Sequence, residues 1–159
     1  MTAEENKALI NRIIDGHNRQ DANAVVACYT PDVANHGRPV GREGMARVYQ
    51  SLYVAFPDFH FELELALAEG EWVTAQVLMT GTHLGTPELP VLGGLLHAVP
   101  ATGKRVAVEN IHLYRIQEGF VAEHRAARDD LGMMQQLGLL PATGHDAGDV
   151  SRPAYRPDP

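Results

Sequence analysis

The amino-acid sequence predicts one α+β domain, in which a curved, mostly antiparallel sheet packs against three N-terminal helices. Three helical patterns fill the first third of the chain, and strand patterns follow them. A two-residue turn joins two long strands near residue 118. The length of 159 residues and the apolar content of 45% suit a single globular domain. This order of elements favours a cone-shaped fold that encloses one cavity.

The first two helices are predicted from their N-terminal caps. Thr2 and Glu5 form a capping box ahead of apolar residues at helical spacing, which predicts a helix over residues 3–18. Asp21 can cap a second helix over residues 22–29. Pro31, two residues after its end, would stop this helix.

A third helix is expected over residues 42–55, ended by the turn at Pro57. The loop ahead of this helix contains Asn35 and His36. A histidine in such a loop can be a plain surface residue or part of a pocket rim, and the loop position alone does not separate the two.

The strands are predicted from alternation and from β-branched and aromatic residues. One strand runs from Phe61 to Leu67 and the next from Trp72 to His83. Residues 106–116 and 120–128 form a hairpin across Glu118-Gly119, where glycine supplies the positive φ that such turns need.

If the hairpin turn is of the simple two-residue kind, His112 faces Arg125, Tyr114 faces Glu123 and Asn110 faces Ala127. One face of the hairpin then carries a polar set: Asn110, His112, Tyr114, Glu123, Arg125 and Asp129. The other face is apolar: Ala107, Ile111, Leu113, Phe120, Ala122 and Ala126. The polar face is either solvated or lines a pocket, and alternation alone would make the apolar face the core side.

The rest of the chain comprises a long connection, a closing helix and a tail. Residues 86–101 form a long loop that contains apolar residues among prolines and glycines. Such a loop is expected to be a lid or rim over a pocket, or a dimer contact. A short helix is expected over residues 130–136, with Asp130 as its N-cap. Residues 1–141 make up the predicted domain, and residues 142–159 have the composition of a disordered tail.

Charge and composition exclude several classes of partner. The net charge of −7 leaves no basic stripe, so neither nucleic acid nor an anionic membrane surface is an expected partner. A lone cysteine and an N-terminus without a signal-peptide pattern predict a cytoplasmic protein. The central strands lack a clean water-facing side, which predicts a homo-oligomer, a dimer or a tetramer.

Motifs for bound cofactors are absent from the sequence. It contains no phosphate-cradling glycine loop, no dinucleotide fingerprint, no CxxC and no HExxH, and its eight histidines are scattered. The sequence therefore predicts no metal and no cofactor, which leaves a cofactor-free reaction or plain ligand binding.

Several segments together resemble the SnoaL-like polyketide cyclases, also called ester cyclases, of the nuclear transport factor 2-like superfamily. The segment FVAEHRAARDDLGMMQQLG, preceded by TGKRV and IHLYRIQEG, is similar to the C-terminal signature of that family. Further similar pieces are NHG with GREGM, AFPDFHFELELALAEGEWV and GTHLG. They cover roughly residues 5 to 141 in the family's order. The resemblance implies the cone-shaped fold of the superfamily.

The resemblance also implies a reaction, an intramolecular aldol ring closure on a mostly apolar, polyoxygenated small molecule, without metal or cofactor. An acidic residue acts as acid and base in these cyclases, and Asp129 holds that place here. Burial would raise the pKa of Asp129, and a neutral His112 could donate to the developing oxyanion. The substrate would be oriented by the remaining candidates: Asn35, His36, His83, Asn110 and Arg125.

Two alternatives stay open beside the cyclase. Epoxide opening would need a water held by Asp129 and a second group, for which Asn110 and Glu123 are the candidates. A non-catalytic small-molecule-binding protein is favoured by Ala126 and Ala127, which stand where relatives often carry acidic or amide residues.

Overall fold

The structure is a computed structural model that describes residues 2–142. Its helices are α1 (Ala3–Asn18), α2 (Ala22–Val26), α3 (Gly41–Ala55) and α4 (Asp130–Gln136), with a short 3-10 turn η1 (Leu92–Gly94). Its strands are β1 (Tyr29–Asn35), β2 (Arg38–Pro39), β3 (His60–Glu69), β4 (Trp72–Thr82), β5 (Arg105–Gln117) and β6 (Phe120–Arg128). Of the predicted tail, residues 143–159 lie outside the described part of the chain.

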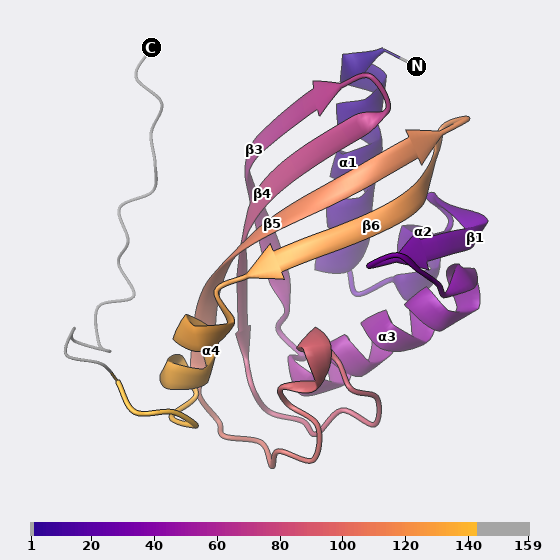
Figure 1. Cartoon of the computed structure of the whole chain (residues 1–159). Helices are drawn as coiled ribbons and strands as arrows, with labels where there is room; N and C mark the ends of the chain where they lie inside the picture. Colours follow the sequence, from indigo (N-terminus) through magenta and orange to yellow (C-terminus); the bar gives the residue numbers. More distant parts are fainter. Residues whose placement is uncertain (1, 143–159) are drawn as a thin grey trace, which may run out of the picture.

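One curved sheet contains all six strands, in the order β2-β1-β6-β5-β4-β3. All neighbouring pairs are antiparallel except β1 and β6, which are parallel. The three N-terminal helices gather on one side of this sheet (Figure 1). The predicted α+β fold, with its curved and mostly antiparallel sheet, is confirmed.

The first helix begins as its sequence predicts. The Thr2 hydroxyl accepts from the Glu5 backbone N–H, and the Glu5 carboxylate accepts from the Thr2 N–H at 2.7 Å. The apolar stripe that follows is buried, with Leu9, Ile10 and Ile13 at most 1% exposed. This pairing of a cap with an apolar face fixes both the start of α1 and the side that it turns to the sheet.

The second helix is shorter than predicted, and a strand was missed. Asp21 caps α2 as expected, with its side chain accepting from Ala24 N, but the helix ends at Val26. The chain then extends as β1, whose pairing with β6 has a register break between Tyr29 and Ala34. Pro31 lies in this break, where its missing N–H costs no ladder hydrogen bond. The proline therefore interrupts the ladder without ending the strand, and Asn35 ends a strand instead of lying in a loop.

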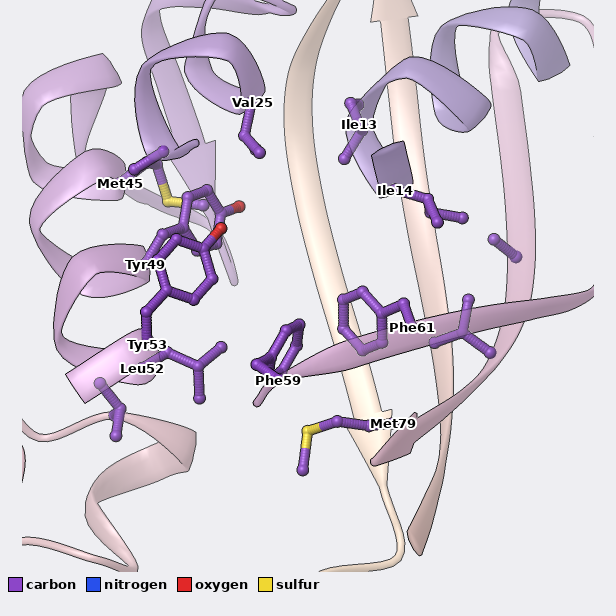
Figure 2. Close-up of a cluster of buried hydrophobic side chains, with 14 of the residues drawn as sticks. Ile13, Ile14, Val25, Met45, Tyr49, Leu52, Tyr53, Phe59, Phe61 and Met79 are labelled. Atoms are coloured by element: carbon purple, nitrogen blue, oxygen red, sulfur yellow. The ribbon is translucent and has the colours of Figure 1, made fainter. Parts of the chain in front are cut away.

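The core lies between the helices and the inner face of the sheet. Figure 2 shows aromatic side chains of α3 meeting those at the start of β3, with Met79 of β4 beside them. Four of these residues are at most 8% exposed: Tyr49, Tyr53, Phe59 and Phe61. The helix side of the core is thus largely aromatic, and two of its members carry hydroxyl groups.

Residues 86–101 cover the same end of the molecule as α4 (Figure 1). Val91 is 2% exposed and Leu96 is fully buried, and both belong to the core cluster. Glycine 85, just before the segment, runs so close to α3 that an added Cβ would lie 2.0 Å from the carbonyl oxygen of Val54. Two of the apolar side chains that suggested a lid or rim therefore point into the molecule, and Leu92 and Leu95 are half-buried against the same core.

The last helix packs against β5 beyond the end of β6. Met133 and Leu137 are buried, and Gly138 ends the helix with a φ of 73°. The side-chain amide of Gln136 pairs with one residue of β5: its Oε1 accepts from Ala107 N at 2.7 Å, and its Nε2 donates to Ala107 O at 3.0 Å. This pair ties α4 to the sheet at a place where β5 pairs with β4 but has no partner on its β6 side.

Candidate active site

The β5–β6 hairpin contains a bulge that decides which side chains face the core. Glu118 and Gly119 have φ values of 50° and 87°, so the turn is of the predicted type. Ile116 pairs with Val121, as a two-residue turn requires, but Arg115 then pairs with Glu123, which leaves Ala122 as an extra residue in β6. One extra residue moves every later side chain of β6 to the opposite face.

The register predicted from the sequence is therefore wrong beyond the bulge. Tyr114 pairs with His124, His112 with Ala126 and Asn110 with Arg128. The polar side of β5 faces inward, because Asn110, His112 and Tyr114 are at most 7% exposed. The face expected to form the core turns outward, and Ile111 and Phe120 are 40% and 42% exposed.

Glu123 and Arg125 consequently lie on the outer face, away from His112. Arg125 Nη2 is 2.6 Å from a Glu123 carboxylate oxygen, and Arg115 Nε is 3.5 Å from the other. This placement corrects the expectation that Arg125 shares a wall with His112. It also places Glu123 and Asn110, the two candidates for the second group in epoxide opening, on opposite faces of the sheet.

Three inward side chains form a chain of contacts that we call the histidine relay: Asn35 of β1, His124 of β6 and His112 of β5. Oδ1 of Asn35 is 3.0 Å from Nδ1 of His124. Nε2 of His124 is in turn 2.9 Å from Nδ1 of His112. The far nitrogen of His112, Nε2, is buried and has no hydrogen-bond partner within residues 2–142.

Aromatic rings enclose the relay. His112 stacks on Tyr114 with an interplanar angle of 9°, and the edge of Phe61 approaches it with 5.4 Å between ring centroids. On the helix side, His17 Nδ1 is 2.8 Å from the Tyr53 hydroxyl. Hydroxyls of Tyr29 and Tyr49 are 2.9 Å apart. The interior thus combines imidazoles and phenols with hydrocarbon walls.

Burial governs the electrostatics of this interior. It lowers the pKa of His112 to about 3 and that of His17 to about 3, and it lowers the pKa of His124 well below its usual value. Burial likewise raises the pKa values of Tyr29 and Tyr114. All of these groups are therefore neutral at pH 7, and they act as hydrogen-bonding groups.

Two further polar groups flank His112. Asn110 Oδ1 is buried and has no partner in the described part of the chain. Arg128, opposite Asn110, directs its guanidinium to Asp130, with Nε 3.0 Å from Oδ1. Its Nη2 is also 3.6 Å from the position that a Cβ on Gly93 would occupy. Arg128 thus links the inner wall to the segment 86–101.

His36 lies at the outer end of the relay. It is exposed, has a φ of 51°, and its backbone N–H donates to His124 O at 2.9 Å. The rings of His36 and His124 are 6.2 Å apart. The structure therefore places His36 beside His124, and Asn35 reaches His112 only through His124.

Asp129 lies outside this group. It is exposed and is the N-cap of α4, with its carboxylate accepting from Gly132 N at 2.9 Å. The expectation that Asp130 is the N-cap is wrong, because Asp130 pairs with Arg128 instead. The backbone N–H of Asp129 donates to Glu109 O, one ladder position beyond the Asn110 pair. In β5 that position belongs to the outer side of the sheet.

His83 also lies apart from the relay. It follows β4 eight residues after Ala75, the β4 partner of His112, which is about 26 Å along a strand. Its ring is fully buried against Phe56, and its Nδ1 is 3.3 Å from the donating N–H of Thr102. His83 therefore anchors the start of the connection to β5.

Sequence reasoning missed His124, Arg128 and the His17–Tyr53 pair as members of the interior. His124 and Arg128 were assigned to the wrong face by the missed bulge. The His17–Tyr53 contact joins α1 to α3 and has no local sequence pattern.

An open recess of about 770 Å³ lies at the end of the molecule that contains the β5–β6 turn. Thr30, Arg42 and Phe120 are among its lining residues, and Arg42 lies over the Phe120 ring at 5.7 Å. It includes none of the predicted site residues. The chemistry-bearing side chains are thus in the packed interior, and this recess is a separate feature.

The architecture defines a class of protein: an α+β cone whose inner wall presents neutral imidazole, amide and phenol groups. A family model described as SnoaL-like polyketide cyclase matches residues 7–137. The chain belongs to this family.

Relatives from Streptomyces give the same result. The chain is 31% identical over 137 residues to aklanonic acid methyl ester cyclase DauD of Streptomyces sp. strain C5, covering 82% of this chain and 80% of that protein. It is 29% identical over 109 residues to the nogalonic acid methyl ester cyclase of Streptomyces nogalater, covering 68% and 75%. Among solved structures, TsrD of Streptomyces laurentii superposes with a TM-score of 0.76 at 26% identity, covering 88% and 99%.

Proposed function

We propose that the protein is a cofactor-independent cyclase that closes a ring in a polyketide-like small molecule. The observation that carries the proposal is the buried, unpartnered Nε2 of His112 on the inner wall of a fold shared with ester cyclases. A neutral imidazole in a water-poor interior can exchange a proton with a bound substrate. In this scheme His112 is the interior catalytic residue.

The reaction would balance without an outside reagent. A proton leaves the carbon next to a carbonyl, the enolate carbon bonds to a second carbonyl carbon, and the alkoxide formed there takes up a proton. Substrate and product therefore have the same mass. Neutral hydrogen-bonding groups around the enolate oxygen would stabilise its developing charge.

The proposal is tested with aklanonic acid methyl ester and nogalonic acid methyl ester as probes. We expect purified protein to convert at least one of them to a product of equal mass and different chromatographic retention, at a rate unchanged by a chelator. His112→Gln should lower kcat about 10²- to 10⁴-fold, the usual contribution of a general acid or base. A fully active His112→Gln protein that retains its fold would remove His112 from the mechanism.

Asp129 remains the second catalytic candidate, and its capping role allows a clean test. Asparagine caps helices about as well as aspartate, so Asp129→Asn removes the carboxylate charge and keeps the cap. A drop in kcat of about 10²-fold or more at unchanged melting temperature would support Asp129 as the acid/base. An unchanged kcat would restrict Asp129 to holding α4.

A second candidate function is non-catalytic binding of the same kind of small molecule. The exposed, hydrogen-bonded position of Asp129 favours it, because the resemblance to the cyclases implies an acidic residue at the substrate. Isothermal titration with the two probes separates the candidates. Binding without conversion would support this second function and overturn the first, and an absence of both would overturn both.

We also infer that the protein is a homo-oligomer, a dimer or a tetramer, that acts in the cytoplasm. The outer sheet face supports the oligomer, since Leu65, Leu67 and Ile111 are 40% exposed or more. Within residues 2–142 no helix is long and apolar enough to cross a membrane. Light scattering at micromolar concentration should give a mass of at least twice 17.3 kDa. A particle of monomer mass would contradict the oligomer.

A further inference from the structure

The histidine relay leads from the rim of the fold to its interior. Asn35 ends β1 beside the exposed His36, His124 lies below it in β6, and His112 is innermost in β5. Each link is a single heavy-atom contact, of 3.0 Å and then 2.9 Å. The last nitrogen, His112 Nε2, has no partner among the described residues.

The chemistry of the outer link determines the proton positions along the whole relay. An amide oxygen has no hydrogen to give, so Asn35 Oδ1 accepts and His124 Nδ1 must hold a proton. A neutral imidazole holds only one proton, so His124 Nε2 is an acceptor. His112 Nδ1 then donates to it, and His112 Nε2 is left with a lone pair.

We propose that Asn35 is a positioning residue, which acts through His124 to hold His112 in the tautomer that presents a lone pair at Nε2. This inference rests on the proposed cyclase function for its catalytic meaning. It reverses the direction expected from the sequence, in which a neutral His112 would donate to an oxyanion. His112 is instead the acceptor.

The acceptor tautomer narrows the class of substrate. Asn110 Oδ1 is two residues from His112 on the same strand face and is likewise unpartnered in residues 2–142. Two buried acceptors without donors are costly until a ligand supplies hydrogens. This wall therefore fits the part of a substrate that gives protons, namely a hydroxyl or enol group and the acidic C–H beside a carbonyl.

Proton transfer to His112 would place an imidazolium beside an enolate. Burial disfavours that cation in the empty protein, where the pKa of His112 is lowered to about 3. An adjacent negative charge raises the pKa of an imidazole. The transfer therefore becomes favourable only as the enolate forms, and the same proton can return to the alkoxide after ring closure.

The tautomers can be observed directly by NMR, without any substrate. In protein labelled with ¹⁵N-histidine, long-range proton–nitrogen correlations separate protonated from unprotonated ring nitrogens, and the His112→Gln and His124→Gln variants assign the signals. At pH 7.5 we expect both residues to carry the proton on Nδ1, with an unprotonated Nε2 on His112. A proton on His112 Nε2 in the parent protein would overturn the proposal, whatever the outcome of the cyclase assays.

Variants at Asn35 test whether this residue sets the tautomer. Asn35→Ala removes the acceptor and should produce a mixture of tautomers at His112, whereas Asn35→Asp keeps an acceptor oxygen and should preserve the parent pattern. Asn23→Ala, at an exposed asparagine of α2, is the matched control and should change nothing. A parent-like His112 signal in folded Asn35→Ala would show that Asn35 is not the positioning residue.

If the protein converts one of the two probes, kcat and KM of the Asn35 variants can be measured as well. Asn35→Ala should lower kcat at least 10-fold with KM changed less than 3-fold, and Asn35→Asp should recover most of the loss. A change confined to KM would make Asn35 a substrate-binding residue and overturn the positioning role.

Discussion

The two faces of the β5–β6 hairpin carry different kinds of polar residue. On the inner face, Asn110, His112 and His124 are buried and neutral, and the ring nitrogens of the two histidines are 2.9 Å apart. The outer face of the same strands carries charged residues in ion pairs, centred on Glu123. Charge is thus largely confined to the side where water can solvate it. The inner face keeps groups that are neutral at pH 7, apart from Arg128, which pairs with Asp130. The bulge at Ala122 determines which residues lie on which face.

Lowering the pH should give the largest loss of stability, and this loss should come from the buried histidines. The buried histidines have folded-state pKa values near 3 for His17 and His112, below the usual 6.5, so the unfolded chain binds more protons between these values. Stability is therefore full above pH 6.5 and falls as the pH decreases. Each histidine contributes about 1.4 kcal/mol per pH unit, so two of them remove on the order of 5 kcal/mol by pH 4.5.

Chemical denaturation at a series of pH values measures this slope. His60 is exposed in β3, so His60→Gln should leave the slope as in the parent protein. His17→Phe should reduce it by one histidine's share, about 1.4 kcal/mol per pH unit. A free energy of unfolding that stays constant from pH 6.5 to 4.5 would contradict the burial of these imidazoles.

A lysine placed on each face in turn tests the register directly. Ala126 faces inward beside His112, and Ala127 faces outward beside Ile111. Ala126→Lys should lower the free energy of unfolding by about 3 kcal/mol or more, since it places an uncompensated charge among neutral groups. Ala127→Lys should change it by less than about 0.5 kcal/mol. If Ala127→Lys were the more destabilising change, β6 would have the register without a bulge, with Ala127 facing inward.

The aspartates that end the hairpin give a smaller contrast. Asp129 caps α4, so Asp129→Ala should cost about 1 kcal/mol in thermal or chemical unfolding. Asp130 forms an ion pair with Arg128 and is half-exposed, so Asp130→Ala should cost less than Asp129→Ala. If Asp130→Ala were the more damaging change, the cap would belong to Asp130.

The outer ion pairs should give the smallest effect. Arg125 is exposed, and removing it by Arg125→Ala should cost at most about 0.5 kcal/mol, with the difference vanishing in 1 M salt. A large loss that persists in high salt would mean that Arg125 packs against a partner surface instead of only pairing with Glu123.

Local signals in the sequence predicted most element boundaries. The Thr2 capping box, the Glu118-Gly119 turn and the Gly138 stop each act within a few residues, and each is found in the structure. Long-range pairings carry no such signal. The parallel contact of β1 with β6 joins segments about ninety residues apart, and Pro31 made β1 look like the end of a helix.

The site was predicted only in part, for a related reason. His112 and Asn110 were correctly placed on one face because alternation within a single strand is a local property. Their neighbours on β6 depend on the bulge at Ala122, which has no distinct residue type to announce it. A one-residue error thus exchanged His124 and Arg128 for Glu123 and Arg125.

The amide of Gln136 has one further consequence, for how copies of this chain meet. Strand β5 extends past the end of β6, and an unprotected strand edge is a template on which another chain can add a strand and aggregate. By bonding both the N–H and the C=O of Ala107, Gln136 acts as a one-residue substitute for the missing strand. Replacing it by leucine would keep the bulk of α4 and reopen that edge, so misassembly through added strands would begin at β5.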